Sequence, residues 1–249
     1  MTTISTLDPV ARAISAAIHA GQVDELRRLL AEHPGLATVR LGDDDPDGMS
    51  RTLLHVATDW PGHFPHIAET IGALVEAGAD VNARFRGPHE ETALHWAASS
   101  DDVEAVVALL DAGADIDADG GVIAGGTPLS DATAFAQWTA ARTLVDRGAR
   151  VGLVDLAALG MTEELLAAFD GPEPRSDDEL NHAFWSACHG GQLDTAKTLL
   201  ERGAQLDWLP GWENASPLDT AARAGAHDVV RWLHSQGART WDQLRDASA

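Results

Sequence analysis

The chain has 249 residues, with 39 acidic against 17 basic side chains and a formal net charge of −22. Such an excess of negative charge opposes a phosphate backbone, so we expect no nucleic-acid partner. A single cysteine, Cys188, allows no disulfide within the chain, and neither a signal peptide nor an apolar run of membrane-spanning length is found. These features indicate a cytoplasmic protein with no membrane partner.

Residues 8–36 carry the pattern of two short helices joined by a glycine turn. Asp8 precedes Pro9, which is the order of an N-cap and a first helical residue. Apolar residues, among them Ile14 and Ile18, then recur at helical spacing before and after the turn. This segment therefore predicts an N-terminal helix pair.

Two irregular stretches surround the next helix pair. The acidic run at residues 43–48 favours a solvated hairpin, because it lacks the alternating ligands and final Glu of a calcium loop. Residues 61–65 lengthen the turn between two helices and place His63 near His66. No Cys or carboxylate stands at a supporting spacing, so we predict no metal site.

Residues 91–118 have the pattern of one complete structural unit. Thr92 is a suitable N-cap for a short helix that carries Ala97 on its apolar face. After a polar turn, a second apolar stripe at helical period predicts a helix that ends before Gly113. The residues that we expect this second helix to bury are Val106, Leu109 and Leu110.

The same unit returns along the chain at a regular period. The pair Gly-Ala ends a predicted helix at Gly78, Gly113, Gly148, Gly203 and Gly237. The spacings between these glycines are 35, 35, 55 and 34 residues. A two-helix unit that repeats every 33 residues or so indicates a stack of repeats, each burying its apolar face against the next.

The motifs within the units resemble those of the ankyrin-repeat family. The family motif T-P-L-H-x-A is matched by Thr52–Ala57, Thr92–Ala97, Thr127–Ala132 and Ser216–Ala221. The motif L-L-x-x-G-A-D-x-N-A is matched by Leu74–Ala83 and Leu109–Ala118. The resemblance covers most of the chain, and it implies that His55 and His95 make structural hydrogen bonds with the Thr and with neighbouring loops.

The resemblance implies an all-α solenoid of about seven stacked helix pairs with short β-hairpin fingers. We expect one domain over residues 1–249, made of a cap at 8–36 and repeats at about 50–84, 90–119, 125–151, 152–170, 179–209 and 211–239. The repeat at 152–170 is predicted to be truncated, because only 8 residues separate Gly148 from the next inner-helix core position, taken as Leu156. The ordinary distance is 19 residues, so we expect this repeat to lack its finger.

In an ankyrin array the fingers and inner helices line a concave groove, and the resemblance implies that this groove binds a protein partner. We therefore predict a soluble binding protein that uses a groove rich in Trp and His for protein–protein interaction. The predicted contact residues are Trp60, Arg84, His89, Trp96, Phe135, Trp185 and Trp212.

An alternative reading of the groove is an acid–base enzyme or binder that acts on a small apolar molecule. Projected onto the groove, Asp131 and Asp155 fall in the same column of adjacent repeats, and His189 comes from the next repeat. With the missing finger beside them and Trp96 and Trp185 flanking, they would line a bay suited to dehydration, addition or cyclisation. Polar residues in such a groove more often contact a protein or cap a helix, so binding remains the leading hypothesis.

Two further expectations follow for the site. The chain has no glycine-rich phosphate loop, Walker-type lysine or dinucleotide motif, so no cofactor is predicted. If Asp155 faces the bay, Asp155→Asn should weaken the function of the groove and change stability by less than about 0.5 kcal/mol.

Overall fold

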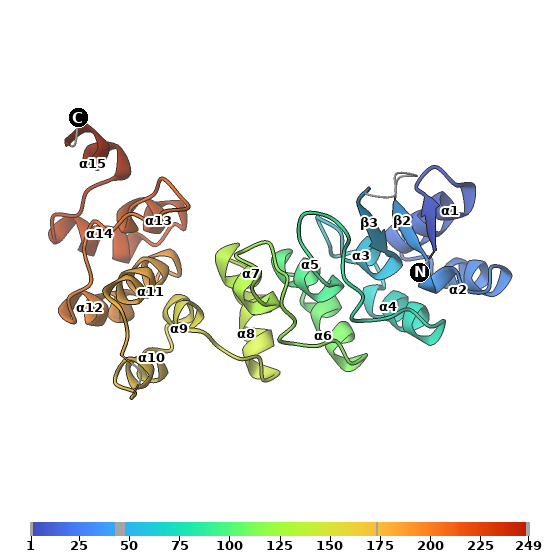
Figure 1. Ribbon diagram of the computed structural model, residues 1–249, viewed down its shortest axis with the longest axis horizontal. Helices are drawn as coiled ribbons and strands as arrows, with labels where there is room; N and C mark the ends of the chain where they lie inside the picture. The colour runs from blue at the N-terminus through green and yellow to red at the C-terminus, as the bar shows by residue number, and fades with distance from the viewer. Residues whose placement is uncertain (1, 43–47, 173, 248–249) are drawn as a thin grey trace. The chain divides into compact units, whose positions relative to one another are not determined.

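The chain folds into consecutive helix pairs, grouped in two compact units, Met1–Arg150 and Val151–Ala249 (Figure 1). The computed structural model describes residues 2–42, 48–172 and 174–247, and most of the predicted acidic loop lies outside them. Among the described helices, none is both long and apolar enough to cross a membrane. The predicted class, an all-α repeat fold with small β-hairpins, is confirmed.

The first unit holds four helix pairs and a small sheet. Its elements are β1 (Thr3–Ser5), α1 (Pro9–His19), α2 (Val23–Glu32), a 3-10 turn (Leu36–Thr38), β2 (Arg40–Gly42), β3 (Ser50–Thr52), α3 (Leu53–Ala57), α4 (Ile67–Glu76), α5 (Ala93–Ser99), α6 (Val103–Asp111), α7 (Pro128–Ala134) and α8 (Trp138–Asp146). The second unit holds three pairs and a final helix. They are α9 (Leu153–Leu159), α10 (Thr162–Phe169), α11 (Asp177–His189), α12 (Leu193–Glu201), α13 (Pro217–Arg223), α14 (His227–Ser235) and α15 (Trp241–Ala247).

Within each unit the first helices of successive pairs contact one another, and so do the second helices. In the first unit α5 contacts α3 and α7, while α6 contacts α4 and α8; in the second, α11 contacts α9 and α13. Small residues make the inner contacts close, since Ala97, Ala132 and Ala187 are fully buried. On α6, Val106 and Leu109 are buried as predicted, whereas Leu110 is only half-buried, because it lies at the edge of the apolar face.

The motif histidines have the predicted structural role. His55 is fully buried, and its Nδ1 lies 2.8 Å from the hydroxyl of its N-cap, Thr52. Its Nε2 donates to the carbonyl of Glu91 at 3.0 Å. One imidazole therefore caps its own helix and also holds the backbone of the next repeat.

A three-stranded sheet in the first unit was not expected. β1 pairs in parallel with β2, and β2 pairs antiparallel with β3. The finger that follows is attached to this sheet through an isolated bridge between Ser50 and Arg86. The buried Arg40 donates to the carbonyls of Ser50 and Arg84 at 2.8 and 2.6 Å, so a cation satisfies backbone groups inside this edge.

The insertion at residues 61–65 joins α3 to α4, as predicted, and contacts the helix pairs before and after it. The Phe64 ring stacks on His19 with centroids 4.5 Å apart. The N–H of His63 donates to Asp102 at 2.6 Å, and its Nε2 donates to the carbonyl of Ser100 at 3.0 Å. The imidazole of His63 is thus committed to a backbone contact with the following repeat.

The connection between α8 and α9 is short. Residues 147–152 are all that separate the two helices, and none of them is in a strand. The boundary between the two units falls in this segment. The predicted loss of a finger at this repeat agrees with the short connection; whether the whole chain is one domain stays a prediction.

Candidate protein-contact surface

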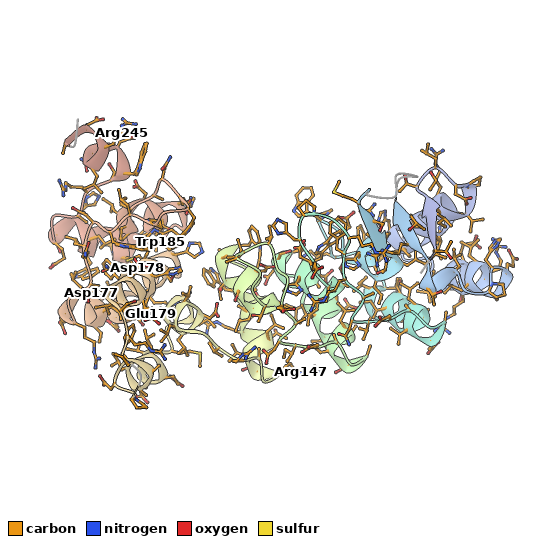
Figure 2. All side chains as sticks on the ribbon, in the orientation of Figure 1. Arg147, Asp177, Asp178, Glu179, Trp185 and Arg245 are labelled. Carbon is orange, nitrogen blue, oxygen red and sulfur yellow. The ribbon has the colours of Figure 1, made fainter. Side chains whose placement is uncertain are left out.

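An aromatic patch lies on the second unit. It consists of His182, Trp185 and His189 from α11 and of Trp208 and Trp212 from the loop before α13. The three α11 residues are spaced by three and four positions, which places them on one face of the helix. Figure 2 shows Trp185 among the side chains of this unit.

The rings of the aromatic patch pack against one another. Trp212 lies 4.6 Å from His182 and contacts Trp185 and Trp208 edge to face, at centroid distances of 6.1 and 5.8 Å. These are the separations and tilts that aromatic pairs favour. Trp212 is nevertheless 59% exposed, and Leu209 beside it is 39% exposed. The patch therefore offers a large ring that is held in place by its neighbours and still faces solvent.

Trp185 is the buried support of the patch. It is only 7% exposed, and its indole N–H donates to the carbonyl of Ala215 at 3.0 Å. Its ring also stacks on His189, with centroids 5.5 Å apart and an interplanar angle of 20°. Of the two tryptophans predicted in this region, Trp212 is the one that presents surface.

Burial lowers the pKa of His182 from its ordinary value, while the nearby charge of Asp178 opposes that shift. The imidazole is therefore neutral at neutral pH and packs as an aromatic ring. Neither His182 nor Trp208 is among the contact residues that the sequence predicts. The spacing of His182 from Trp185 and His189 could have indicated His182. That spacing places the three residues on one helix face only if α11 begins as early as Asp177.

The first unit has a smaller ring cluster around Trp96. This ring is half-buried and lies 4.9 Å from His55 and 5.4 Å from Phe85. Burial raises the pKa of Glu91, and a hydrogen bond from Trp96 opposes part of that rise. Arg84 is fixed next to the cluster by its bond to the carbonyl of Asp119 at 2.7 Å. These contacts order the finger between α4 and α5, on which the predicted contact residues Arg84 and His89 lie.

Three other predicted contact residues of the first unit are exposed. Trp60 follows α3 and is 82% exposed, Phe135 ends α7 and is 45% exposed, and His89 lies on an exposed finger. Trp60 and Phe135 both lie at the C-terminal ends of inner helices. Among the described residues, no aromatic ring contacts Trp60, in contrast to Trp212.

Asp131 lies beneath its own finger and does not open onto a groove. The residue is fully buried, and Oδ1 accepts the N–H of Ile123 at 3.4 Å while Oδ2 has no hydrogen-bond partner. A Cβ at Gly121 would come within 2.9 Å of both carboxylate oxygens, so the finger can cover the acid only with glycine there. Burial raises the pKa of Asp131 to about 7, and the charge of Glu91 adds to the rise.

Asp155 does not occupy the column of Asp131, and the predicted alignment of the two acids is wrong. Asp155 is the third residue of α9, and its Oδ2 accepts the N–H of the N-cap Gly152 at 3.3 Å. Asp131 is the fourth residue of α7. The reason is that Ala157, fully buried, is the core alanine of α9 in place of Leu156.

The three predicted catalytic residues are divided between the units. Asp131 belongs to the first unit, and Asp155 and His189 to the second. The Nδ1 of His189 lies 3.2 Å from the hydroxyl of Thr220. A hollow of about 230 Å³ in the second unit lies beside the truncated repeat, but none of the three residues lines it. Its lining residues are Phe169, Arg175, Ser176, Asp177, Leu180 and Arg202.

The chain is similar to known ankyrin-repeat proteins. Among curated proteins, the ankyrin repeat and KH domain-containing protein mask-1 of Caenorhabditis elegans is 41% identical over 51 residues, which are 20% of this chain and 2% of that protein. The chain thus spans a small part of the length of this relative. The solved human ASB11 ankyrin repeat domain is 24% identical, with 91% of this chain and 84% of that chain covered and a TM-score of 0.49.

The family model described as ankyrin repeats in three copies matches residues 68–155 and 156–243. These two segments together cover more than half of the chain, and they include residues of both units. The chain belongs to the ankyrin-repeat family.

Proposed function

We propose that this chain is a protein-binding module and that the aromatic patch of the second unit is a contact surface for its partner. Ankyrin-repeat domains are in general protein–protein interaction modules. The observation that supports this surface most is Trp212, which is 59% exposed although three aromatic rings hold it. A pre-ordered ring loses little conformational freedom on binding, and Trp is the residue most often found as an interface anchor.

The first unit adds a second candidate contact surface in this proposal. Trp60, Phe135 and His89 are its exposed members, and Trp96 and Arg84 order the finger beside them. A reducing compartment such as the cytoplasm suits the buried, unpaired Cys188. The partner is a protein, since 39 acidic side chains disfavour a nucleic acid.

Site-specific photo-crosslinking tests the proposed surface. A benzophenone side chain at Leu209, in the aromatic patch, should capture a discrete partner that the same group at Asp194 does not capture. Asp194 is a matched control because its side chain is 95% exposed on α12, away from the patch residues of the inner helix. Trp212→Ala should abolish the Leu209 product; equal products from both positions, with or without Trp212, would rule the patch out.

The acid–base alternative has one supporting observation, the raised pKa of Asp131. A substrate would reach this carboxyl only if the finger at residues 120–126 moved, because the residue is fully buried beneath it. Asp155 has a capping role at Gly152, and His189 packs on Trp185. Binding is therefore the function we favour. Turnover of any small apolar carbonyl compound that disappears in Asp131→Asn would reverse this preference.

A further inference from the structure

One face of α11 combines a negative charge with the aromatic patch. Asp178, His182, Trp185 and His189 follow one another at intervals of four, three and four residues, so they share this face. Asp178 is exposed, and in the described part of the chain it forms no ion pair. Its field reaches the ring of His182, where it opposes the lowering of the pKa. This face of α11 therefore begins with a carboxylate that forms no ion pair in the described structure, and it continues into the aromatic patch.

The other acids around the patch are already neutralised. Glu179 pairs with Arg175 at 3.2 Å, and Glu213, next to Trp212, pairs with Arg223. Asp207, next to Trp208, pairs with Arg239 at 2.8 Å. Figure 2 places Asp177 and Asp178 with Glu179 at the start of α11. The charge that is left for a ligand at this end of the patch is that of Asp177 and Asp178, in the first turn of α11.

The rings of the half-buried Trp208 and the exposed Trp212 have no cation stacked on them in the described structure. Among the described residues, no Arg or Lys side chain lies over Trp208 or Trp212. The same unit makes such a contact elsewhere, because the Arg245 guanidinium lies 4.8 Å from the centroid of Trp241. The pair at α15 shows how a guanidinium packs on a tryptophan of this unit, with a carboxylate at Asp242 beside it at 3.1 Å.

We propose that the aromatic patch binds an arginine side chain in a basic segment of the partner protein. The guanidinium plane lies on the exposed ring of Trp212, and its charge is balanced by Asp178. Residues 151–249 contain 16 acidic against 7 basic side chains, which favours the approach of a basic segment. This inference rests on the proposed binding function and names the chemistry of the partner.

A blocked pentapeptide with two arginines between glycines is the probe. Titrated into the full chain labelled with ¹⁵N, it should shift the indole N–H signals of Trp208 and Trp212. The same peptide with citrulline keeps the shape and removes the charge, and it should bind roughly 3- to 20-fold more weakly, the range of a cation–π contact. Trp212→Ala should lose the shift at Trp208, and Asp178→Asn should weaken the arginine peptide about threefold without affecting the citrulline peptide.

Two controls separate this site from general attraction to an acidic protein. Met49→Ala removes an apolar side chain of similar exposure, 57%, from the first unit and should leave the dissociation constant unchanged. Trp212→Phe keeps an aromatic face and should retain most of the binding, whereas a misfolded Trp212→Ala would be detected by its circular dichroism. Equal binding of the arginine and citrulline peptides, or binding that is indifferent to Trp212, would overturn the proposal.

The result is distinguishable from a failure of the binding function itself. If crosslinking from Leu209 captures a partner that depends on Trp212, while the arginine peptide neither binds nor competes, the partner is recognised by other chemistry. In that outcome the arginine proposal falls and the contact surface stands. If neither assay depends on Trp212, both fall.

Discussion

In each unit an inner helix is bonded to the next repeat through the carbonyl that directly precedes the next N-cap, but the donors differ. In the first unit His95 donates through Nε2 to the carbonyl of Gly126 at 3.2 Å, directly before the N-cap Thr127. In the second unit Trp185 donates through its indole to the carbonyl of Ala215 at 3.0 Å, directly before the next N-cap. The position requires a buried donor of the right reach, and either ring supplies it.

The difference between the donors changes how the helix begins. The imidazole of His95 has a second nitrogen, which accepts the N–H of its N-cap Thr92 at 3.1 Å. Trp185 has one N–H and no acceptor, so it cannot cap α11. The helix instead starts earlier, at Asp177, where Ser176 and Glu179 form a capping box. A longer α11 is what brings Asp178 and His182 into line with the aromatic patch.

The largest effect should come from breaking the histidine version of the link. His55→Ala removes a fully buried ring, its bond to Thr52 and its bond to the carbonyl of Glu91. We expect the first unit to lose roughly 3–5 kcal/mol, from a cavity and stranded polar groups. Hydrogen exchange of α3 and α5 measures the loss, and the exposed His33→Ala should leave it unchanged. Protection equal to that of the parent protein would show that His55 is dispensable.

His55 also gives the first unit a pH dependence. Burial lowers its pKa to about 4, whereas the unfolded residue takes a proton near 6.5. The unfolded state therefore binds more protons in this window, and stability is lost as the pH falls from about 6.5 to 4. His55→Gln should remove this part of the acid-side decline in melting temperature. An unchanged decline would assign it to other groups.

The buried acid of the first unit should act in the opposite direction. Asp131 has a folded pKa of about 7 against an ordinary 3.8, so its contribution is present at low pH and is lost as the pH rises from about 4 to 7. Asp131→Asn keeps an oxygen for the N–H of Ile123 and removes the charge. We expect about 2–3 kcal/mol of stabilisation near pH 8 and none near pH 4. Melting curves across that range measure it, and a variant that is less stable near pH 8 would contradict it.

A smaller effect should follow when the hydrogen bond from the Trp185 indole to the carbonyl of Ala215 is removed and the aromatic ring is kept. Trp185→Phe keeps an aromatic ring and leaves the carbonyl of Ala215 without its donor. The second unit should lose about 1–2 kcal/mol by hydrogen exchange. Trp208→Phe is the matched control, because no hydrogen bond of its indole N–H occurs in the described structure. Equal losses in the two variants would place the effect in ring packing alone.

The smallest stability change is expected for Asp155→Asn. The amide oxygen still accepts the N–H of Gly152, so unfolding should change by less than about 0.5 kcal/mol. If the variant also loses partner capture, Asp155 belongs to the binding site, as the sequence predicts. A large fall in melting temperature would assign the residue to the scaffold. Normal melting with normal capture would remove it from the site.

Helix limits and caps were predictable because they depend on local chemistry. Asp8 and Thr92 are N-caps as expected, and Gly113 has the positive φ of 92° that a helix C-terminus needs. The histidine of the repeat motif was correctly given a structural role. In each case the partner lies within a few residues or one repeat away.

The site was less predictable because it depends on register and on distant contacts. The prediction took Leu156 as the core residue of α9, whereas the core residue is Ala157. This error of one position in the repeat alignment placed Asp155 in the same column as Asp131. The sequence predicts that Trp185 faces the groove, because the motif gives its position on the helix and no information on its hydrogen-bond partner. That partner, the carbonyl of Ala215, lies 30 residues away. β1 pairs Ile4 with Leu41, and a strand of three residues is too short for its sequence to indicate which strand it pairs with.

The insertion at residues 61–65 changes how local unfolding spreads from one helix pair to the next in the first unit. A repeat array normally transmits strain only between adjacent pairs, so its stability is close to a sum of neighbour terms. Here Phe64 stacks on His19 of the pair before, while His63 bonds to Ser100 of the pair after. One loop thus links three successive pairs. Each contact strengthens the interface between adjacent pairs, so fraying that starts at the N-terminal cap is opposed at two successive interfaces, and the first three pairs should open as one cooperative block.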